Sequence, residues 1–232
     1  MKKLVFFTGA GVSQESGIPT FRDITDGLYM DHEIEEAVTK EGWMRKRELV
    51  LNFHNTLRRK IKDVFPNEAH TLIARLEGEY QVTVITQNID DLHERGGSST
   101  VYHLHGELLK SRSTLNHKIY DCADDINIGD KCPDGSQLRP HTVFFGEEPY
   151  FIQQAYEALS EADILVVVGT SLQIGYTVLL LGATSAKEIY YVDPEPSLEL
   201  ENRLNIFNKP KVNYIKKKAV AGMENLFKKL VK

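Results

Sequence analysis

The chain has 232 residues, of which 41% are hydrophobic, so it can bury one sizeable core, or one large lobe with a smaller insertion. Its 28 Lys and Arg residues against 33 Asp and Glu residues give a formal charge of −5, which argues against a nucleic acid or an acidic membrane as partner. Two cysteines, Cys122 and Cys132, are too few for a disulfide framework and fit a reducing compartment.

The N-terminal stretch carries too little apolar sequence for export or for membrane insertion. Only four apolar residues, 4–7, separate Lys3 from Thr8, far short of a signal-peptide core or a membrane span. We therefore expect a cytoplasmic protein without a membrane partner. We also expect a monomer, and the net charge predicts no nucleic-acid partner.

Short β-rich apolar runs alternate with stretches of helical periodicity, which is typical of a parallel sheet covered on both faces. Most of these runs end in a polar or glycine-bearing loop. In open α/β sheets, ligands bind outside the carboxyl ends of the strands, so these loops are where we expect the chemistry. The predicted strands are residues 4–8, 81–86, 142–145, 164–169, 188–193 and 212–215.

Two segments interrupt this alternation. Residues 27–70 are predicted to be helical, and a further helix is predicted to start at Pro66-Asn67. Residues 111–137 are rich in Asp, Asn, Gly and Ser without a clear period, which predicts an irregular insertion. The apolar stripe of the helical segment consists of Val50, Phe53, Leu57 and Ile61.

The first strand leads into a Gly-Ala-Gly loop. Glycines at positions 9 and 11 let the backbone approach a pyrophosphate closely, and a helix starting near Ser13 would direct its amides at that charge. A tight turn without any ligand uses the same residues. A dehydrogenase fingerprint would place its third glycine at Gln14 and an acidic residue at the end of a second strand, but residues 22–32 do not form a strand pattern. Hydride transfer is therefore disfavoured.

Two further polar stretches offer candidate site residues, and the first of them directly follows an apolar strand. In "ITQNIDDLHERGG", Gln87, Asn88 and Asp90 can hold ribose hydroxyls or an amide-bearing ligand, or can simply cap the next helix. In "VYHLHGELL", His105 can act as a general base, because histidine titrates near neutrality. A structural role is the alternative, and His103 doubles the ambiguity.

Five motifs together resemble the sirtuins, a family of NAD-dependent protein-lysine deacylases, and look most like the short bacterial members. The motifs are "GAGVSQESGIPTFR", "TQNID", "HLHGELL", "LRPHTVFFGE" and "GTSLQIG", which occur in the family's order and approximate spacing from about Lys3 to the last helix. The resemblance implies one catalytic domain of the α/β class. Its Rossmann-like parallel sheet carries helices on both faces in a large lobe (about 1–26, 71–110 and 138–232), beside a small lobe (about 27–70 and 111–137).

The resemblance implies a role for each matching residue in binding NAD. The opening loop would continue into a segment that folds over the cofactor and shields the reacting ribose from water. The implied cofactor-binding residues are Gly9, Ala10, Gly11, Pro19, Phe21, Arg22, Gln87, Asn88, Asp90, His105, Gly169, Thr170, Ser171, Asp193 and Ala219. Asp193-Pro194 stands where the family usually has Asn-Pro, which keeps an acceptor and loses a donor.

The resemblance also implies the reaction. An acyl-lysine oxygen captures the ribose carbon as nicotinamide leaves, and His105 then activates a ribose hydroxyl, so that the acyl group moves to the sugar and free lysine departs. The implied catalytic residues are His105, Asn88 and Asp90. The acyl-lysine peptide would pair with the strand-like edge formed by Val143, Phe144, Phe145, Gly146 and Glu147, mainly through backbone hydrogen bonds.

The chain departs from the family at two places. The first expected zinc cysteine falls at Ser113, and Cys132 lacks its partner, so we predict no zinc and no metal site. On the helix that lines the acyl channel, His54 and Leu57 replace the Tyr and Arg that pair with acidic acyl groups in some relatives. We therefore expect acetyl or another neutral acyl group as substrate, although a one-residue shift in register would bring Arg58 into the channel instead.

Two other functions stay open at the level of sequence. An NAD hydrolase or ADP-ribosyltransferase would use the same cofactor loops with a different acceptor, which the peptide-binding edge argues against. A non-catalytic NAD sensor would need the phosphate loop but no base, which the presence of Asn88, Asp90 and His105 together argues against.

Overall fold

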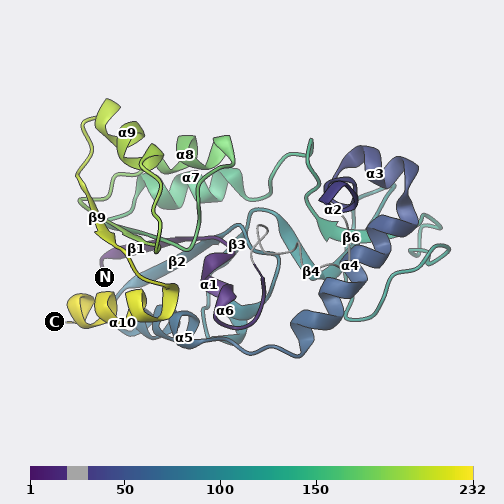
Figure 1. The fold of residues 1–232 in the computed structure, drawn as a ribbon, viewed down its shortest axis with the longest axis horizontal. Helices are drawn as coiled ribbons and strands as arrows, with labels where there is room; N and C mark the ends of the chain where they lie inside the picture. The colour runs from purple at the N-terminus through teal and green to yellow at the C-terminus, as the bar shows by residue number, and fades with distance from the viewer. Residues whose placement is uncertain (20–30, 232) are drawn as a thin grey trace.

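The computed structural model describes residues 1–19 and 31–231, and that part of the chain contains two β-sheets (Figure 1). The larger sheet has six strands in the order β3-β2-β1-β7-β8-β9, and every neighbouring pair is parallel. Its strands are β1 (Lys3–Thr8), β2 (Gln81–Thr86), β3 (Val101–His103), β7 (Ile164–Val168), β8 (Glu188–Val192) and β9 (Val212–Ile215).

The order of this sheet reverses between β1 and β7. The chain winds outward through β2 and β3 on one side of β1 and through β8 and β9 on the other. The two strands on either side of the reversal run in register, with Thr8 opposite Val168 at their carboxyl ends. A doubly wound sheet opens a crevice for ligands at such a reversal, so the loops after β1 and β7 flank the expected site.

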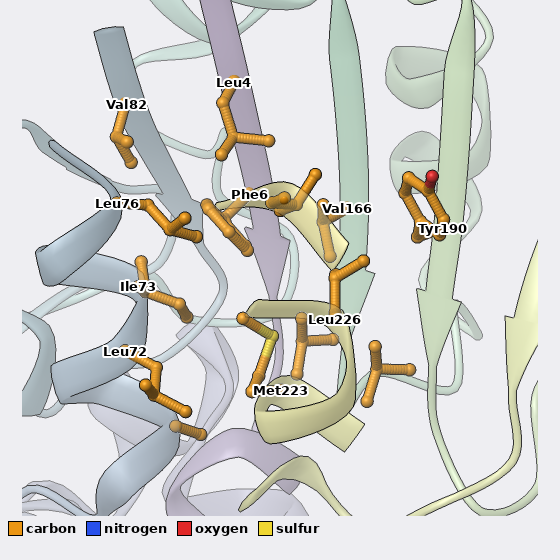
Figure 2. Packing of buried hydrophobic residues seen from close by; sticks show 14 of the residues in the cluster. Leu4, Phe6, Leu72, Ile73, Leu76, Val82, Val166, Tyr190, Met223 and Leu226 are labelled. Atoms are coloured by element: carbon orange, nitrogen blue, oxygen red, sulfur yellow. The ribbon is translucent and has the colours of Figure 1, made fainter. Parts of the chain in front are cut away.

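Alternating side chains of the strands build one core on each face of the sheet. In β1, Leu4 and Phe6 point to one face, whereas Val5 and Phe7 point to the other, and all four are buried. Figure 2 shows the first face, where side chains of α5 and α10 pack on the strands. The helices that cover this face are α5 (Glu68–Arg75), extended by a 3₁₀ turn (Leu76–Gly78), and α10 (Ala219–Leu230). The opposite face is covered by α7 (Ile152–Ser160), α8 (Gly175–Leu181) and α9 (Glu199–Ile206).

Local sequence explains where the helices begin. The side chain of Asn67 accepts the amide of Ala69, and His70 Nδ1 accepts the amide of Asn67, which closes a capping box at the start of α5. Two short helices, α1 (Gly11–Gln14) and α6 (Leu92–Arg95), follow β1 and β2. Among the residues that the structure describes, no helix is both long and apolar enough to cross a bilayer.

The smaller sheet is antiparallel and is packed against helices from residues 31–62. It has the order β5-β4-β6, formed by β4 (Gly106–Ser113), β5 (Ile119–Asp121) and β6 (Leu138–Thr142). The helices are α2 (Asp31–Ala37), α3 (Lys40–Arg45) and α4 (Arg47–Lys62), which lie beside β4 and β6 in Figure 1. The core between them contains Trp43, Val50, Leu51, Ile126 and Phe144.

The predicted α/β class with its covered parallel sheet is confirmed, and five of the predicted strands appear within one residue of their expected ends. The strand predicted at 142–145 is wrong. Residues 138–142 form β6 of the antiparallel sheet, after which Val143 donates its amide to the carbonyl of His105 and Phe145 donates to that of Val38. The apolar run therefore pairs with segments outside the parallel sheet. The segment predicted to be irregular also contains β5 and the end of β4.

Candidate active site

The loops after β1 and β7 touch through glycines. The amide of Gly9 donates to the carbonyl of Val168 at 3.1 Å, and that of Gly11 donates to the carbonyl of Gly169 at 2.8 Å. A Cβ atom on Gly11 would lie only 2.7 Å from the Cα atom of Gly169, and Gly169 itself has a φ of +60°. Packing between the two loops therefore requires these glycines independently of any ligand.

Gln87 ties the loop after β2 to two other segments. Its backbone amide donates to the carbonyl of Thr8 at 2.9 Å, and its side-chain oxygen accepts the hydroxyl of Thr170 at 2.7 Å. Its own carbonyl lies 2.8 Å from Nδ1 of His105. One residue thus links β1, the loop after β7 and the histidine motif at the carboxyl edge of the sheet.

The partners of His103 identify it as a charged, structural histidine. Its Nδ1 lies 2.8 Å from the carbonyl oxygen of Asn88, and its Nε2 lies 2.7 Å from a carboxylate oxygen of Glu94. Both partners only accept hydrogen bonds, so both ring nitrogens must donate. Burial disfavours the imidazolium, but the hydrogen bond and the charge of Glu94 outweigh it, and the pKa of His103 is raised. A ring with both nitrogens protonated cannot act as a base.

His105 has the complementary pattern. Its Nδ1 must donate to the carbonyl of Gln87, whereas its Nε2 lies 2.7 Å from the hydroxyl of Tyr176, a group that can donate. Burial lowers the pKa of His105, against the opposing effect of the Gln87 carbonyl. The ring is therefore neutral, with the lone pair of Nε2 directed at a hydroxyl group, which is the state that a general base requires.

Gly106, the residue after His105, lies in close contact with the backbone of β6. Its φ is +82°, and a Cβ atom there would lie 2.1 Å from the carbonyl oxygen of His141, so only glycine fits. Gly106 is also the first residue of β4, which pairs with β6. His105 therefore lies where the chain leaves the edge of the parallel sheet and enters the antiparallel one.

A buried polar network lies beneath this edge. Ser13 donates its hydroxyl to Asp90 at 3.1 Å and accepts the side-chain amide of Asn88 at 3.2 Å. His70 Nε2 lies 3.4 Å from the same hydroxyl. Because Nδ1 of His70 accepts the amide of Asn67, Nε2 carries the proton and donates to Ser13. Burial raises the pKa of Asp90, against the hydrogen bonds from Leu92 and Ser13.

The remaining predicted cofactor residues that the structure describes come from several separate segments. Asp193 follows β8, and its carboxylate accepts the amide of Glu195 at 2.8 Å. Ala219 is only 4% exposed and is part of the core beneath α10. Ala10, Pro19 and Ser171 are half-buried. Phe21 and Arg22 lie outside the described residues.

The predicted acyl-channel residues of α4 are tightly packed. His54 is 2% exposed, with Nδ1 bonded to the carbonyl of Val50 at 2.8 Å and Nε2 lying 3.1 Å from the hydroxyl of Thr142. Burial lowers the pKa of His54 to about 4. Leu57 is half-buried against the cluster that contains Phe53.

Arg58, the alternative acyl-channel residue, is fully buried. Its Nε donates to the carbonyl of Leu108 at 2.9 Å, and its Nη1 donates to Asn55 at 2.6 Å. These contacts join α4 to β4 and give Arg58 a structural role.

The predicted peptide edge is held on one side by the protein itself. Besides the amides of Val143 and Phe145, the amide of Phe144 is bonded, in this case to the carboxylate of Glu147 at 2.9 Å. Glu147 in turn pairs with Arg112 and Arg139. Phe144 is 1% exposed, whereas Phe145 is 58% exposed. The segment is thus fixed by the protein's own hydrogen bonds, turns at Gly146, whose φ is +86°, and leaves one aromatic side chain in solvent.

Hydrogen bonds hold together the region that would carry the zinc-binding cysteines of the sirtuin pattern. The hydroxyl oxygen of Ser113 accepts the amides of Leu115 and Asn116 at 3.0 Å, and its proton is donated to Asp134 at 2.6 Å. Ser136 donates to the same carboxylate at 2.7 Å. Within residues 1–19 and 31–231, no group of three His, Cys, Asp or Glu residues is arranged to hold a metal ion.

Sequence reasoning missed two residues of this site. The sequence indicates Ser13 only as a helix start, whereas in the structure its hydroxyl joins Asn88 to Asp90. Tyr176, whose hydroxyl reaches the candidate base, follows "GTSLQIG" without any pattern that would mark it.

The sequence is similar to a known family profile and to curated proteins over most or all of its length. A profile of the Sir2 family matches residues 9–175. The chain is 44% identical over its whole length to an NAD-dependent protein deacylase of Helicobacter pylori, covering 98% of that protein. It is 42% identical, again over its whole length, to an NAD-dependent protein deacylase of Bacteroides thetaiotaomicron, covering 99% of that protein.

Solved structures are similar as well. A Sir2 homologue in complex with NAD has a TM-score of 0.84 and 33% identity, covering 98% of this chain and 89% of its own. A Sir2 structure in complex with an inhibitor, 2′-O-acetyl-ADP-ribose and a deacetylated p53 peptide has a TM-score of 0.76 and 26% identity. The latter match covers 97% of this chain and 93% of the other.

Proposed function

The chain belongs to the Sir2 family, and we propose that it removes acyl groups from protein lysines in a reaction that consumes NAD and one water molecule and yields nicotinamide, O-acyl-ADP-ribose and free lysine. Its relatives at 42–44% identity over the whole chain bear the name of that activity. Structures of the same fold have been solved with NAD and with acetyl-ADP-ribose beside a deacetylated peptide.

One observation carries the proposed mechanism: the Nε2 lone pair of His105 is directed at a hydroxyl group. The Gln87 carbonyl fixes the proton on Nδ1, and the ring is neutral because burial lowers its pKa. A ribose hydroxyl that reaches Nε2 would give up its proton there. His103 is excluded from this step because both of its nitrogens donate to acceptors.

The residues at the carboxyl edge fit a dinucleotide. The glycine loops after β1 and β7 meet at the point where the sheet order reverses, and the Gln87, Asn88 and Asp90 loop lies directly after the neighbouring strand β2. NAD supplies the acyl-accepting ribose and nicotinamide as leaving group. The protein would hold the phosphates with the glycine loops, orient the ribose with Asn88 and Asp90, and take a proton at Nε2 of His105.

The test is to incubate the purified protein with NAD and an acetyl-lysine peptide and to identify the products by mass spectrometry. Equimolar nicotinamide, O-acetyl-ADP-ribose and free-lysine peptide are expected. An NAD hydrolase would release free ADP-ribose without any peptide, and a sensor would release no product. Either result would overturn the proposal.

We further propose that the substrate acyl group is uncharged. The channel residues His54 and Leu57 offer no cation, and Arg58 already donates to Leu108 and Asn55. A carboxylate buried beside Leu57 without a partner would be costly. Acetyl or a longer apolar acyl chain avoids that cost.

The finer features of the protein are proposed on the same basis. The substrate peptide would lie along residues 143–147, where the amides of Val143, Phe144 and Phe145 already fix the backbone. The Ser113, Asp134 and Ser136 hydrogen bonds would do the work that a structural zinc ion does elsewhere, so that the small lobe needs no metal. We also propose that the protein is a cytoplasmic monomer. The two cysteines, which form no disulfide, support the cytoplasmic location.

A further inference from the structure

The hydroxyl of Tyr176 is hydrogen-bonded to Nε2 of His105. In the proposed mechanism, this nitrogen accepts a proton from a ribose hydroxyl of NAD. The Tyr176 oxygen lies 2.7 Å from Nε2 of His105, and the two rings meet edge to face, with centroids 6.1 Å apart at 81°. Tyr176 is the second residue of α8, directly after the loop that begins at Gly169. The two partners thus come from segments on opposite sides of the reversal of the sheet.

The direction of this hydrogen bond follows from the other ring nitrogen. The carbonyl of Gln87 accepts from Nδ1, so in the neutral ring Nε2 carries a lone pair and no proton. Tyr176 must therefore donate to Nε2. A ribose hydroxyl that is about to be deprotonated would make the same bond, with the same donor type and the same acceptor.

The rest of Tyr176 is held by packing. Its ring lies against the core that contains Leu180 and Leu181. Burial raises the pKa of the Tyr176 hydroxyl well above its ordinary value of 10, so the hydroxyl keeps its proton at neutral pH. It can donate a hydrogen bond, but it is a poor relay for the proton that His105 would accept.

We infer that Tyr176 is a positioning residue that acts as an internal stand-in for the ribose hydroxyl. In the free enzyme its hydroxyl donates to the unprotonated Nε2 of the tautomer that Gln87 sets, and so keeps the ring turned toward the sugar site. When NAD binds, the ribose hydroxyl replaces the Tyr176 hydroxyl at Nε2. This inference rests on the proposed function, because it takes NAD as the ligand.

The stand-in role makes NAD compete with the protein's own hydroxyl. A typical intramolecular hydrogen bond contributes about 1 kcal/mol. Removal of the bond between Tyr176 and His105 should therefore tighten NAD binding about three- to tenfold. The gain should disappear once His105 is absent, because no bond then remains to be exchanged. The rate at saturating NAD should stay near that of the wild type, since the Tyr176 bond is already broken in the reacting complex.

The experiment is a double-mutant cycle on NAD binding, measured by calorimetry without peptide. It compares wild type, Tyr176→Phe, His105→Ala and the double variant, with Tyr156→Phe in the exposed face of α7 as a matched control. We expect Tyr176→Phe to lower the Kd for NAD about three- to tenfold and the control to leave it unchanged. In the His105→Ala background, Tyr176→Phe should change nothing.

Steady-state deacylation separates the stand-in from other roles. Tyr176→Phe should lower KM for NAD and keep kcat within about twofold of the wild type. An unchanged Kd, an equal change in the His105→Ala background, or a large fall in kcat would each overturn the inference. Wild-type protein that binds NAD but forms no acyl-ADP-ribose would overturn the proposed reaction and leave the binding cycle valid, whereas absence of NAD binding would overturn both.

Discussion

The amide of Gly11 donates to the carbonyl of Gly169 at 2.8 Å and thereby joins the loops after β1 and β7 at the point where the strand order reverses. The contact leaves no space for a side chain on either residue. The shape of the proposed phosphate site is thus set by glycine packing before any ligand arrives.

Gly11→Ala should therefore distort the proposed phosphate site more than it disturbs the rest of the fold. The new methyl group would lie 2.7 Å from the Cα atom of Gly169, so the two loops must separate. We expect a loss of NAD affinity, measured by calorimetry, together with a lower melting temperature. Gly78→Ala is the matched control, since a Cβ atom there meets nothing within 4 Å. NAD affinity equal to that of the wild type in Gly11→Ala would contradict this account of the loops.

His105→Ala should abolish deacylation while the fold and most of the NAD affinity persist. Loss of a general base typically costs about 10²- to 10⁴-fold in rate. The measurement is the turnover of an acetyl-lysine peptide, with NAD affinity determined separately. His103→Gln serves as the contrast: it should reduce stability, because the Glu94 and Asn88 contacts change, and should retain far more activity. Turnover near that of the wild type in His105→Ala would remove His105 from its proposed role.

Buried neutral histidines should make the protein sensitive to mild acid. Burial lowers the pKa of both His54 and His70 from 6.5 to about 4. As the pH falls below 6.5, these histidines bind protons in the unfolded state but not yet in the folded state, which favours unfolding. The free energy of unfolding is therefore highest above pH 6.5 and falls between about pH 6.5 and pH 4. Each histidine contributes a loss of about 1.4 kcal/mol per pH unit within that window.

Urea unfolding at pH 7.5 and pH 5 measures this loss. His54→Asn, which removes one titrating group, should make the fall in unfolding free energy shallower, whereas His117→Asn at the surface should leave it unchanged. A fall of the same size in His54→Asn and the wild type would show that His54 does not cause it.

Ser113→Ala should destabilise the end of the smaller sheet, where Ser113 is the last residue of β4. The change leaves the amides of Leu115 and Asn116 and the carboxylate of Asp134 without their shared partner, at a cost of about 1–3 kcal/mol. Ser160→Ala, which removes an exposed hydroxyl at the end of α7, is the control. Chemical unfolding gives the free energies. If the proposed hydrogen bonds replace zinc, a chelator should change neither the wild-type melting temperature nor the activity.

The wild type should turn over an acetyl-lysine peptide faster than a succinyl-lysine peptide of the same sequence. An unpaired buried carboxylate costs several kcal/mol, which predicts a preference of more than tenfold in kcat/KM. Leu57→Arg would place a cation at the channel and should shift the ratio toward succinyl, whereas Leu57→Met should not. Equal rates on the two peptides with the wild type would contradict the proposed neutral channel.

Most of the parallel sheet could be predicted from the sequence because its strands are continuous apolar runs followed by polar loops. Val101–His103 was missed because three residues are too short for a recognisable period. Residues 142–145 were assigned to the wrong sheet, since an apolar run does not indicate its partner. The pairing of Val143 with His105 is a tertiary contact that no local pattern contains.

Some residues of the candidate site could likewise be predicted from the sequence, whereas others could not. The glycine loops and Gln87 could be predicted because each follows an apolar run, whereas the two histidines were recognisable only as part of the motif "HLHGELL". The difference between His103 and His105 depends on which acceptors face each nitrogen, and those acceptors come from distant parts of the chain. Tyr176 was missed for the same reason: it lies 71 residues from its partner.

The pairing of β1 with β7 also constrains how the protein can be made. Phe6 lies opposite Val166, so the central strand leaves the ribosome long before its second neighbour has been synthesised. Until then one edge of this strand stays unpaired, while everything that forms the smaller sheet is translated in between. Closing so long a loop is slow, and the step that pairs these two strands should be the one that also brings the two glycine loops together.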